Sequence, residues 1–170
     1  MPITLTSLTR APARGDPLVA LLEEYNALMA RKLIAAGGPA VDLSGAIDQM
    51  RADMAPYLPP QGQVFLAHAD DRLVGCGFLR RIRSDAAEMK RLYVLPDCQG
   101  QGLGRRLIEA RIDAARAMGL SDLYADTIIG NNDMLRLYER LGFRRIERYA
   151  ENAHPPERSA WLVYLHRPVG

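Results

Sequence analysis

The sequence predicts an α/β fold in which helices cover both faces of a mixed, mostly antiparallel sheet of about seven strands. Three observations support this class. Segments with the two-residue period of strands alternate with segments of helical period. A pair of aspartates separates two strand-like segments, which indicates an antiparallel hairpin. Further along, a helical segment links two strand-like segments, which favours a parallel pair.

The N-terminal part predicts a strand followed by a long helix. Apolar residues alternate with Thr and Ser from Ile3 to Leu8, as in a strand with one buried face. Asp16 and Pro17 then provide an N-cap and a proline at the first helical position, and Gly37 ends the helix. The helix carries one apolar stripe, which we interpret as core: Leu18, Leu21, Leu22, Tyr25, Leu28 and Met29.

The middle of the chain predicts a second helix and then three strands. Apolar residues at helical spacing favour a helix from Leu43 to Met54, which ends before Pro56. Asp70 and Asp71 form the turn of the expected hairpin. The strands are expected at Val64–His68, Leu73–Ile82 and Ala86–Val94.

The C-terminal part alternates helices and strands. A helix with apolar residues on one side runs from about Leu103 to a stop at Gly119, and a second runs from Asn131 to Leu141 with its stop at Gly142. Asn131 suits the N-cap of this second helix. Strands are expected at Leu123–Thr127, Phe143–Tyr149 and Ser159–His166.

A glycine-rich turn joins the strand Ala86–Val94 to the helix that follows it. Glycines at 100, 102 and 104 let the backbone approach a ligand closely, and the first helical turn offers unpaired N–H groups that suit phosphate oxygens. The turn lacks the dinucleotide fingerprint, because Arg105 stands where a third glycine is needed. It also lacks the Lys-Ser or Lys-Thr of a Walker loop.

Two motifs together resemble the Gcn5-related N-acetyltransferase (GNAT) family. Gln99-Gly-Gln-Gly102-Leu-Gly104 is similar to the family's acetyl-coenzyme A signature, Gln/Arg-x-x-Gly-x-Gly/Ala. The segment from Asn131 to Phe143 resembles its Asn-x-x-Ala-x-x-Leu-Tyr-x-x-x-Gly-Phe motif, with Met134 in place of alanine. The resemblance runs from about residue 62 to 166. It implies a GNAT fold, in which the fourth and fifth strands splay apart.

The resemblance also implies how an acyl donor would bind. The pantetheine arm of acetyl-CoA is expected along the backbone of Leu92, Tyr93 and Val94, with the Val94 N–H aimed at the thioester carbonyl. Main-chain N–H groups of the turn are expected to hold the pyrophosphate, and Asn131 to contact the cofactor. The turn residues concerned are Gln99, Gly100, Gln101, Gly102, Leu103, Gly104 and Arg105.

Two side chains are candidates for proton transfer. Glu88 stands at the start of the fourth strand, where many relatives place a glutamate that acts as general base directly or through water. Tyr138 matches the family tyrosine whose hydroxyl approaches the CoA sulfur, and it is the candidate general acid. The residues alone leave structural roles open, since Glu88 could be a solvated strand end and Tyr138 could be core.

Composition favours a single domain over residues 1–170, with an acceptor-side segment at about 16–60 and an acetyl-CoA-binding core at about 62–166. The 22 basic and 20 acidic residues are interspersed, so neither nucleic acid nor a membrane surface is an expected partner. Two cysteines without Cys-x-x-Cys spacing, and no recognisable leader, predict a cytoplasmic location. Three widely spaced histidines predict no metal site.

The expected function is transfer of an acetyl group from acetyl-CoA to a primary amine of a small molecule or a peptide. Two alternatives stay open from the sequence. One is a noncatalytic acyl-CoA-binding sensor or regulatory domain, and the other is a protein that binds a different phosphate ligand at the same glycines. The identity of the amine, the length of the acyl group and the oligomeric state, a homodimer included, are not determined by the sequence.

Overall fold

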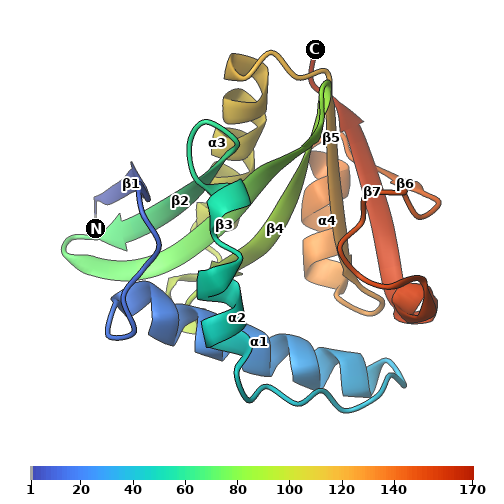
Figure 1. The fold of residues 1–170 in the computed structure, drawn as a ribbon, viewed down its shortest axis with the longest axis horizontal. Coiled ribbons are helices and arrows are strands. Elements are labelled where there is room, and N and C mark those ends of the chain that lie inside the picture. The colour runs from blue at the N-terminus through green and yellow to red at the C-terminus, as the bar shows by residue number, and fades with distance from the viewer. Residues whose placement is uncertain (1) are drawn as a thin grey trace.

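The computed structural model describes residues 2–170, which form one seven-stranded sheet flanked by helices (Figure 1). The sheet order is β1-β2-β3-β4-β5-β7-β6. The strands are β1 (Ile3–Ser7), β2 (Gly62–Ala69), β3 (Arg72–Arg83), β4 (Ala86–Val94), β5 (Asp122–Ile128), β6 (Arg144–Ile146) and β7 (Leu162–Pro168). Only the β4–β5 pair is parallel, so the predicted mixed and mostly antiparallel sheet is confirmed.

Within the described residues 2–170, four α-helices and three short 3₁₀ helices accompany the sheet. The α-helices are α1 (Pro17–Ala35), α2 (Ala46–Ala52), α3 (Leu103–Ala117) and α4 (Asn132–Arg140). The 3₁₀ helices are η1 (Ala55–Tyr57), η2 (Pro96–Cys98) and η3 (Pro156–Trp161). In Figure 1, α1 and α2 lie on the near face of the sheet and α3 and α4 on the far face. Helices on both faces, as predicted, shield the apolar side chains of the sheet from water.

Most of the predicted helix ends are confirmed. The Asp16 carboxylate accepts a hydrogen bond of 2.9 Å from the Leu18 N–H, and Pro17 is the first residue of α1. Gly119 and Gly142 follow α3 and α4 with φ values of 72° and 86°, a region that glycine occupies without a steric penalty.

Three elements are shorter than predicted. The helix expected from Leu43 begins only at Ala46, because the Asp42 carboxylate accepts from the Ser44 N–H at 2.8 Å and Gly45 adopts a left-handed φ of 74°. The strand expected from Phe143 is reduced to β6, three residues long. The last strand begins at Leu162, because η3 occupies the residues before it.

The strands β4 and β5 pair over a short distance and then separate. The parallel register runs from Ala86 opposite Asp122 to Met89 opposite Ala125 and ends there. Beyond this point β4 continues against β3 only, and β5 against β7 only. Figure 1 shows the two strands close together at the top of the view and apart towards α1. The predicted splay between the fourth and fifth strands is confirmed.

A β-bulge distorts β4 where it leaves β5. Phe78 pairs with Lys90 and Cys76 pairs with Tyr93, so two residues of β4, Arg91 and Leu92, face a single residue of β3. Arg91 has a φ of 48°, which is uncommon for a residue with a side chain. Such a bulge bends its strand and turns the following peptide groups. The bulge therefore determines how the peptide groups of β4 are oriented along the gap.

No helix among residues 2–170 has the length and apolar character that a bilayer crossing requires.

Candidate active site

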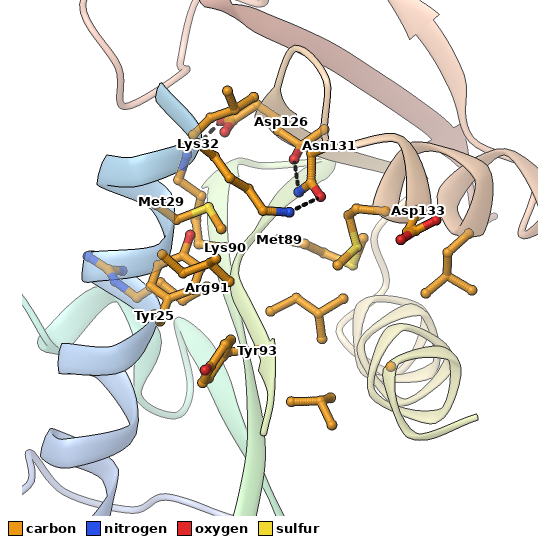
Figure 2. Close-up of a pocket in the computed structure, with 18 of the residues that line it drawn as sticks. Tyr25, Met29, Lys32, Met89, Lys90, Arg91, Tyr93, Asp126, Asn131 and Asp133 are labelled. Carbon is orange, nitrogen blue, oxygen red and sulfur yellow. Dashed lines mark hydrogen bonds and ion pairs between the residues drawn. The ribbon is translucent and has the colours of Figure 1, made fainter. Parts of the chain in front are cut away.

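A cavity of about 610 Å³ occupies the gap between β4 and β5 (Figure 2). Its walls come from the second half of α1, the ends of β4 and β5, the glycine-rich turn and α4. The volume lies in the range of pockets that bind small molecules and cofactors. The splay thus opens a site that passes from one face of the sheet to the other.

The glycine-rich turn forms one end of the cavity. Its lining residues from the predicted set are Gln99, Gly100, Gly102, Leu103, Gly104 and Arg105. Gly100 and Gly102 have φ values of 75° and 79°, and a Cβ added at Gly102 would meet no atom within 4 Å. Glycine is therefore required at Gly102 for its backbone conformation. Gln101, the remaining member of the set, is exposed and does not line the cavity.

The first turn of α3 directs its N–H groups towards the same end. Gly102 is the N-cap residue and supplies no side chain to satisfy these donors. The Gln99 side chain donates a hydrogen bond of 2.9 Å to the Val94 carbonyl, which ties the turn to the end of β4. Unsatisfied N–H groups at the positive end of a helix form a site for an anion such as a phosphate.

The last residues of β4 form the adjoining wall. Leu92, Tyr93 and Val94 all line the cavity, as the sequence led us to expect for a bound pantetheine arm. Because β5 has already diverged, the β4 edge that faces the cavity has no strand partner beyond Met89. Its main-chain donors and acceptors are thus available to an extended ligand that lies along the strand.

Tyr138 lies on α4 at the wall of the cavity, with a side chain 4 % exposed. Its ring packs edge-on against Phe143 with 5.1 Å between ring centroids. Burial raises the pKa of the Tyr138 phenol above its usual value, and the positive charge of Arg111 opposes that rise. The hydroxyl is therefore held in its protonated form at neutral pH.

Glu88 is fully buried and does not line the cavity. Its carboxylate accepts hydrogen bonds from Arg80 Nη2 at 2.7 Å and from the Tyr149 hydroxyl at 2.6 Å. Lys90 Nζ and Asn152 Nδ2 lie slightly farther away, at 3.5 and 3.4 Å. The structure therefore separates Glu88 from Tyr138: only the tyrosine reaches the cavity surface.

The carboxylate that does line the cavity next to β4 belongs to Asp126, which the sequence analysis did not identify. Figure 2 shows Asp126 beside Lys90, and Lys90 Nζ lies 2.7 Å from Asp126 Oδ2. Asn152 Nδ2 donates to the same oxygen at 2.7 Å, and His154 Nε2 lies 3.5 Å from Oδ1. His154 and Lys90 also line the cavity. Burial would raise the pKa of Asp126, but the charge of Lys90 and the contact with His154 lower it below its usual value.

Asn131 lies in the cavity wall but does not use its side chain as the predicted N-cap. Its Oδ1 accepts a hydrogen bond of 2.6 Å from Lys32 Nζ (Figure 2), and its Nδ2 donates to the Thr127 hydroxyl at 2.9 Å. The expectation of a side-chain cap was wrong because both ends of the amide are engaged by these partners. The backbone carbonyl of Asn131 still accepts from the Leu135 N–H.

The apolar stripe of α1 divides into two parts. Leu18, Leu21 and Leu22 are buried, as the prediction of a core stripe requires. Tyr25 and Met29 instead line the cavity, together with Leu28. Burial raises the pKa of Tyr25 to about 12, so its hydroxyl also stays protonated. Helical periodicity located this face, but it could not distinguish packing against the sheet from packing around an open space.

Comparisons with known proteins agree with this geometry. The model of the acetyltransferase (GNAT) family matches residues 31–143. The IAA acetyltransferase of Azospirillum brasilense is 29 % identical over 138 residues, which cover 81 % of this chain and 83 % of that protein.

Solved structures show the same fold. An acetyltransferase from Streptococcus agalactiae superposes with a TM-score of 0.77 at 22 % identity, covering 98 % of both chains. A GNAT family acetyltransferase from Elizabethkingia anophelis, solved with acetyl-CoA bound, superposes with a TM-score of 0.63 at 21 % identity and covers 98 % of this chain and 97 % of that one. With the family model matched across the glycine-rich turn and Tyr138, the chain belongs to the GNAT family of acetyltransferases.

Proposed function

We propose that this enzyme transfers the acetyl group of acetyl-CoA directly to a primary amine of a small molecule or a peptide. The observation that carries the proposal is the single cavity that joins the glycine-rich turn, the free edge of β4 and the buried Tyr138 hydroxyl. An extended donor needs these three features in this order: a phosphate site, a strand edge and a proton donor at its reactive end.

In the proposed complex the pyrophosphate binds to the main chain of Gln99–Arg105 at the start of α3. The pantetheine arm follows Leu92 and Tyr93, and the Val94 N–H donates to the thioester carbonyl. When the amine attacks, this carbonyl oxygen gains negative charge. One well-placed donor to such an oxyanion lowers the barrier by about 3 kcal/mol.

Tyr138 is the proposed general acid. After the tetrahedral intermediate collapses, the C–S bond breaks and the CoA sulfur leaves with the electron pair. The phenol, which its surroundings hold protonated, then supplies the proton that this thiolate needs. The support for this role is its position at the cavity wall on α4, next to the β4 edge that would carry the thioester.

The attacking amine must lose a proton. An amine with a pKa of about 10.4 requires roughly 4 to 5 kcal/mol to reach its neutral form at pH 7. We propose that His154 accepts this proton and that Asp126 orients the imidazole, because both line the cavity and lie 3.5 Å apart. Glu88, the base expected from the sequence, is assigned an indirect role: it contacts Lys90 and Asn152, and both of these contact Asp126.

Free-thiol release from acetyl-CoA tests the proposal. The assay would use a panel of polyamines, amino acids, aminoglycosides and short peptides, with the variants Tyr138→Phe, His154→Gln and Glu88→Gln. We expect one amine class to give release above hydrolysis. Loss of a general acid or base reduces the rate by about 10²- to 10⁴-fold. Tyr138→Phe should lower kcat in this way with acetyl-CoA affinity nearly unchanged.

The three variants also separate the roles. His154→Gln should lower the rate more than Glu88→Gln, since only His154 reaches the cavity. If Glu88→Gln lowers the rate more than His154→Gln does, Glu88 rather than His154 is the general base. Acetyl-CoA binding without release for any amine would instead favour the noncatalytic sensor.

A further inference from the structure

Arg111, in the middle of α3, is a fully buried cation without a carboxylate partner. Its side chain has 0 % exposure and is the largest of the fully buried side chains. No ion pair joins it to an acid within residues 2–170. A buried charge costs free energy unless other groups satisfy it. If Arg111 only filled space in the core, an apolar side chain would do so at a lower free-energy cost.

Main-chain carbonyls, two of them beside the bulge of β4, accept hydrogen bonds from Nη1 and Nε of Arg111, while Nη2 has no hydrogen-bond partner among the described residues. Nη1 donates to the Phe78 carbonyl at 3.3 Å and to the Lys90 carbonyl at 3.4 Å, and Nε donates to Leu107 at 3.0 Å within α3. Phe78 and Lys90 are opposite one another in the β3–β4 ladder, and they form the last regular pair before the bulge. The guanidinium thus bridges both strands at the point where β4 changes direction.

Gly77 provides the space for this contact. It is the single β3 residue that faces Arg91 and Leu92 across the bulge. A Cβ built on Gly77 would lie 2.9 Å from Arg111 Nε and 3.1 Å from Cζ, closer than a side chain tolerates. Gly77 and Arg111, on different elements, are therefore complementary in shape, and even a methyl group at Gly77 must displace the guanidinium.

We infer that Arg111 is a positioning residue for acyl transfer: by holding the Lys90 carbonyl it fixes the bulge, and with it the course of the backbone of Leu92, Tyr93 and Val94, which line the cavity. This inference rests on the proposed function, in which this backbone binds the donor. The inferred route is the backbone of β4. The charge of Arg111 also opposes the rise in the pKa of the Tyr138 phenol, so hydrogen exchange in β4, and not kcat alone, tests this route.

Arg111→Met is the primary variant, because an apolar side chain of similar length often replaces a buried charge without loss of stability. Complete loss of one oxyanion donor slows acyl transfer by about 10²- to 10³-fold, and a donor that is only misplaced slows it less. We therefore expect kcat to fall by at least about tenfold, with the Kd for CoA within about threefold of wild type and Tm nearly unchanged. Arg111→Lys, which keeps one donor, should recover part of kcat. A kcat within twofold of wild type, or one that falls only in proportion to the folded fraction, would overturn the inference.

Gly77→Ala is the matched variant. With Arg111 present, the added methyl group should displace the guanidinium and lower kcat; in the Arg111→Met background it should have little further effect, since the group it displaces is gone. An equal effect in both backgrounds would show that Gly77→Ala acts by general strain and would contradict the inferred role of Arg111.

Amide hydrogen exchange tests the inferred role of Arg111 without any substrate. The amides on the β3 side of the strand end, Tyr93 opposite Cys76 and Leu95, which donates to the Val74 carbonyl, should exchange at least about tenfold faster in Arg111→Met and in Gly77→Ala, while amides in the β1–β2 pair stay at the wild-type rate. Unchanged exchange at Tyr93 and Leu95 would reject this role of Arg111 even if the enzyme proves active. Absence of thiol release by the wild type would reject the proposed function. The hydrogen-exchange result would then still show whether Arg111 holds the backbone of β4 in place.

Discussion

Lys32 Nζ donates a hydrogen bond of 2.6 Å to Asn131 Oδ1, across 99 positions of the sequence. Lys32 lies near the end of α1 and Asn131 immediately before α4, and both line the cavity (Figure 2). The bond therefore joins the helix on the proposed acceptor side to the segment on the proposed cofactor side. It holds two walls of the site together from opposite faces of the sheet.

Removing either partner should uncouple these walls. Hydrogen bonds to a charged group contribute about 1.5–3 kcal/mol, less where water has access. For Lys32→Met, Asn131→Ala and the double variant, urea unfolding should give a coupling energy of about 1 kcal/mol. Strictly additive effects would show that the contact does not hold α1 in solution. Arg14→Met serves as the control, because Arg14 is exposed and contacts Asp48 rather than the cavity.

The glycine-rich turn offers a second test with an internal control. Gly102 and Gly119 precede and follow α3 with φ values of 79° and 72°, and a Cβ at either would meet no atom within 4 Å. Valine at either position is strained by about 1–3 kcal/mol. Gly102→Val and Gly119→Val should therefore lose similar stability in urea, whereas calorimetry should show weaker CoA binding only for Gly102→Val. Equal CoA affinity in the two variants would show that the glycine-rich turn does not bind CoA.

The sequence predicted the order of the elements because local signals determine them. Asp16 with Pro17, the Asp70 turn, and Gly119 and Gly142 each specify a helix end or a turn from a few neighbouring residues. Each of these is confirmed. The start of α2 was wrong because the Asp42 side chain forms a turn of its own ahead of the helix, and the start of β7 was wrong because η3 occupies the residues before it.

The site was predictable only where a motif marks it. The turn from Gln99 to Arg105 and Tyr138 belong to continuous motifs, and both line the cavity apart from the exposed Gln101. Asp126 and Arg111 carry no local signal, since their partners Lys90 and Phe78 come from distant strands. An expected base at Glu88 followed from its position along β4, but its contacts with Arg80 and Tyr149 depend on tertiary packing.

Asp126 predicts an acid-sensitive contribution to stability. The charge of Lys90 and the contact with His154 outweigh the effect of burial and lower the folded-state pKa of Asp126. A carboxylate whose pKa is lower in the folded state stabilises the protein above its unfolded-state pKa of about 3.9, and this stabilisation is lost as the pH falls below that value through the folded-state pKa.

Asp126→Asn removes this contribution. Since loss of one partner of a buried ion pair costs about 3–5 kcal/mol, the variant should be less stable than wild type by about 3 kcal/mol at pH 7. The difference should persist at pH 5 and shrink as the pH falls from about 4 towards 2, because the carboxylate becomes protonated in the unfolded wild-type protein while it stays ionised in the folded one. Urea unfolding at pH 7, 5 and 3 measures it. Asp133→Asn is the control, since Asp133 pairs with Arg136 on the surface with its side chain 97 % exposed and should change stability little at any of these pH values. A difference for Asp126→Asn that stays constant from pH 7 to 3 would show that packing, rather than the charge of Asp126, stabilises this wall of the cavity.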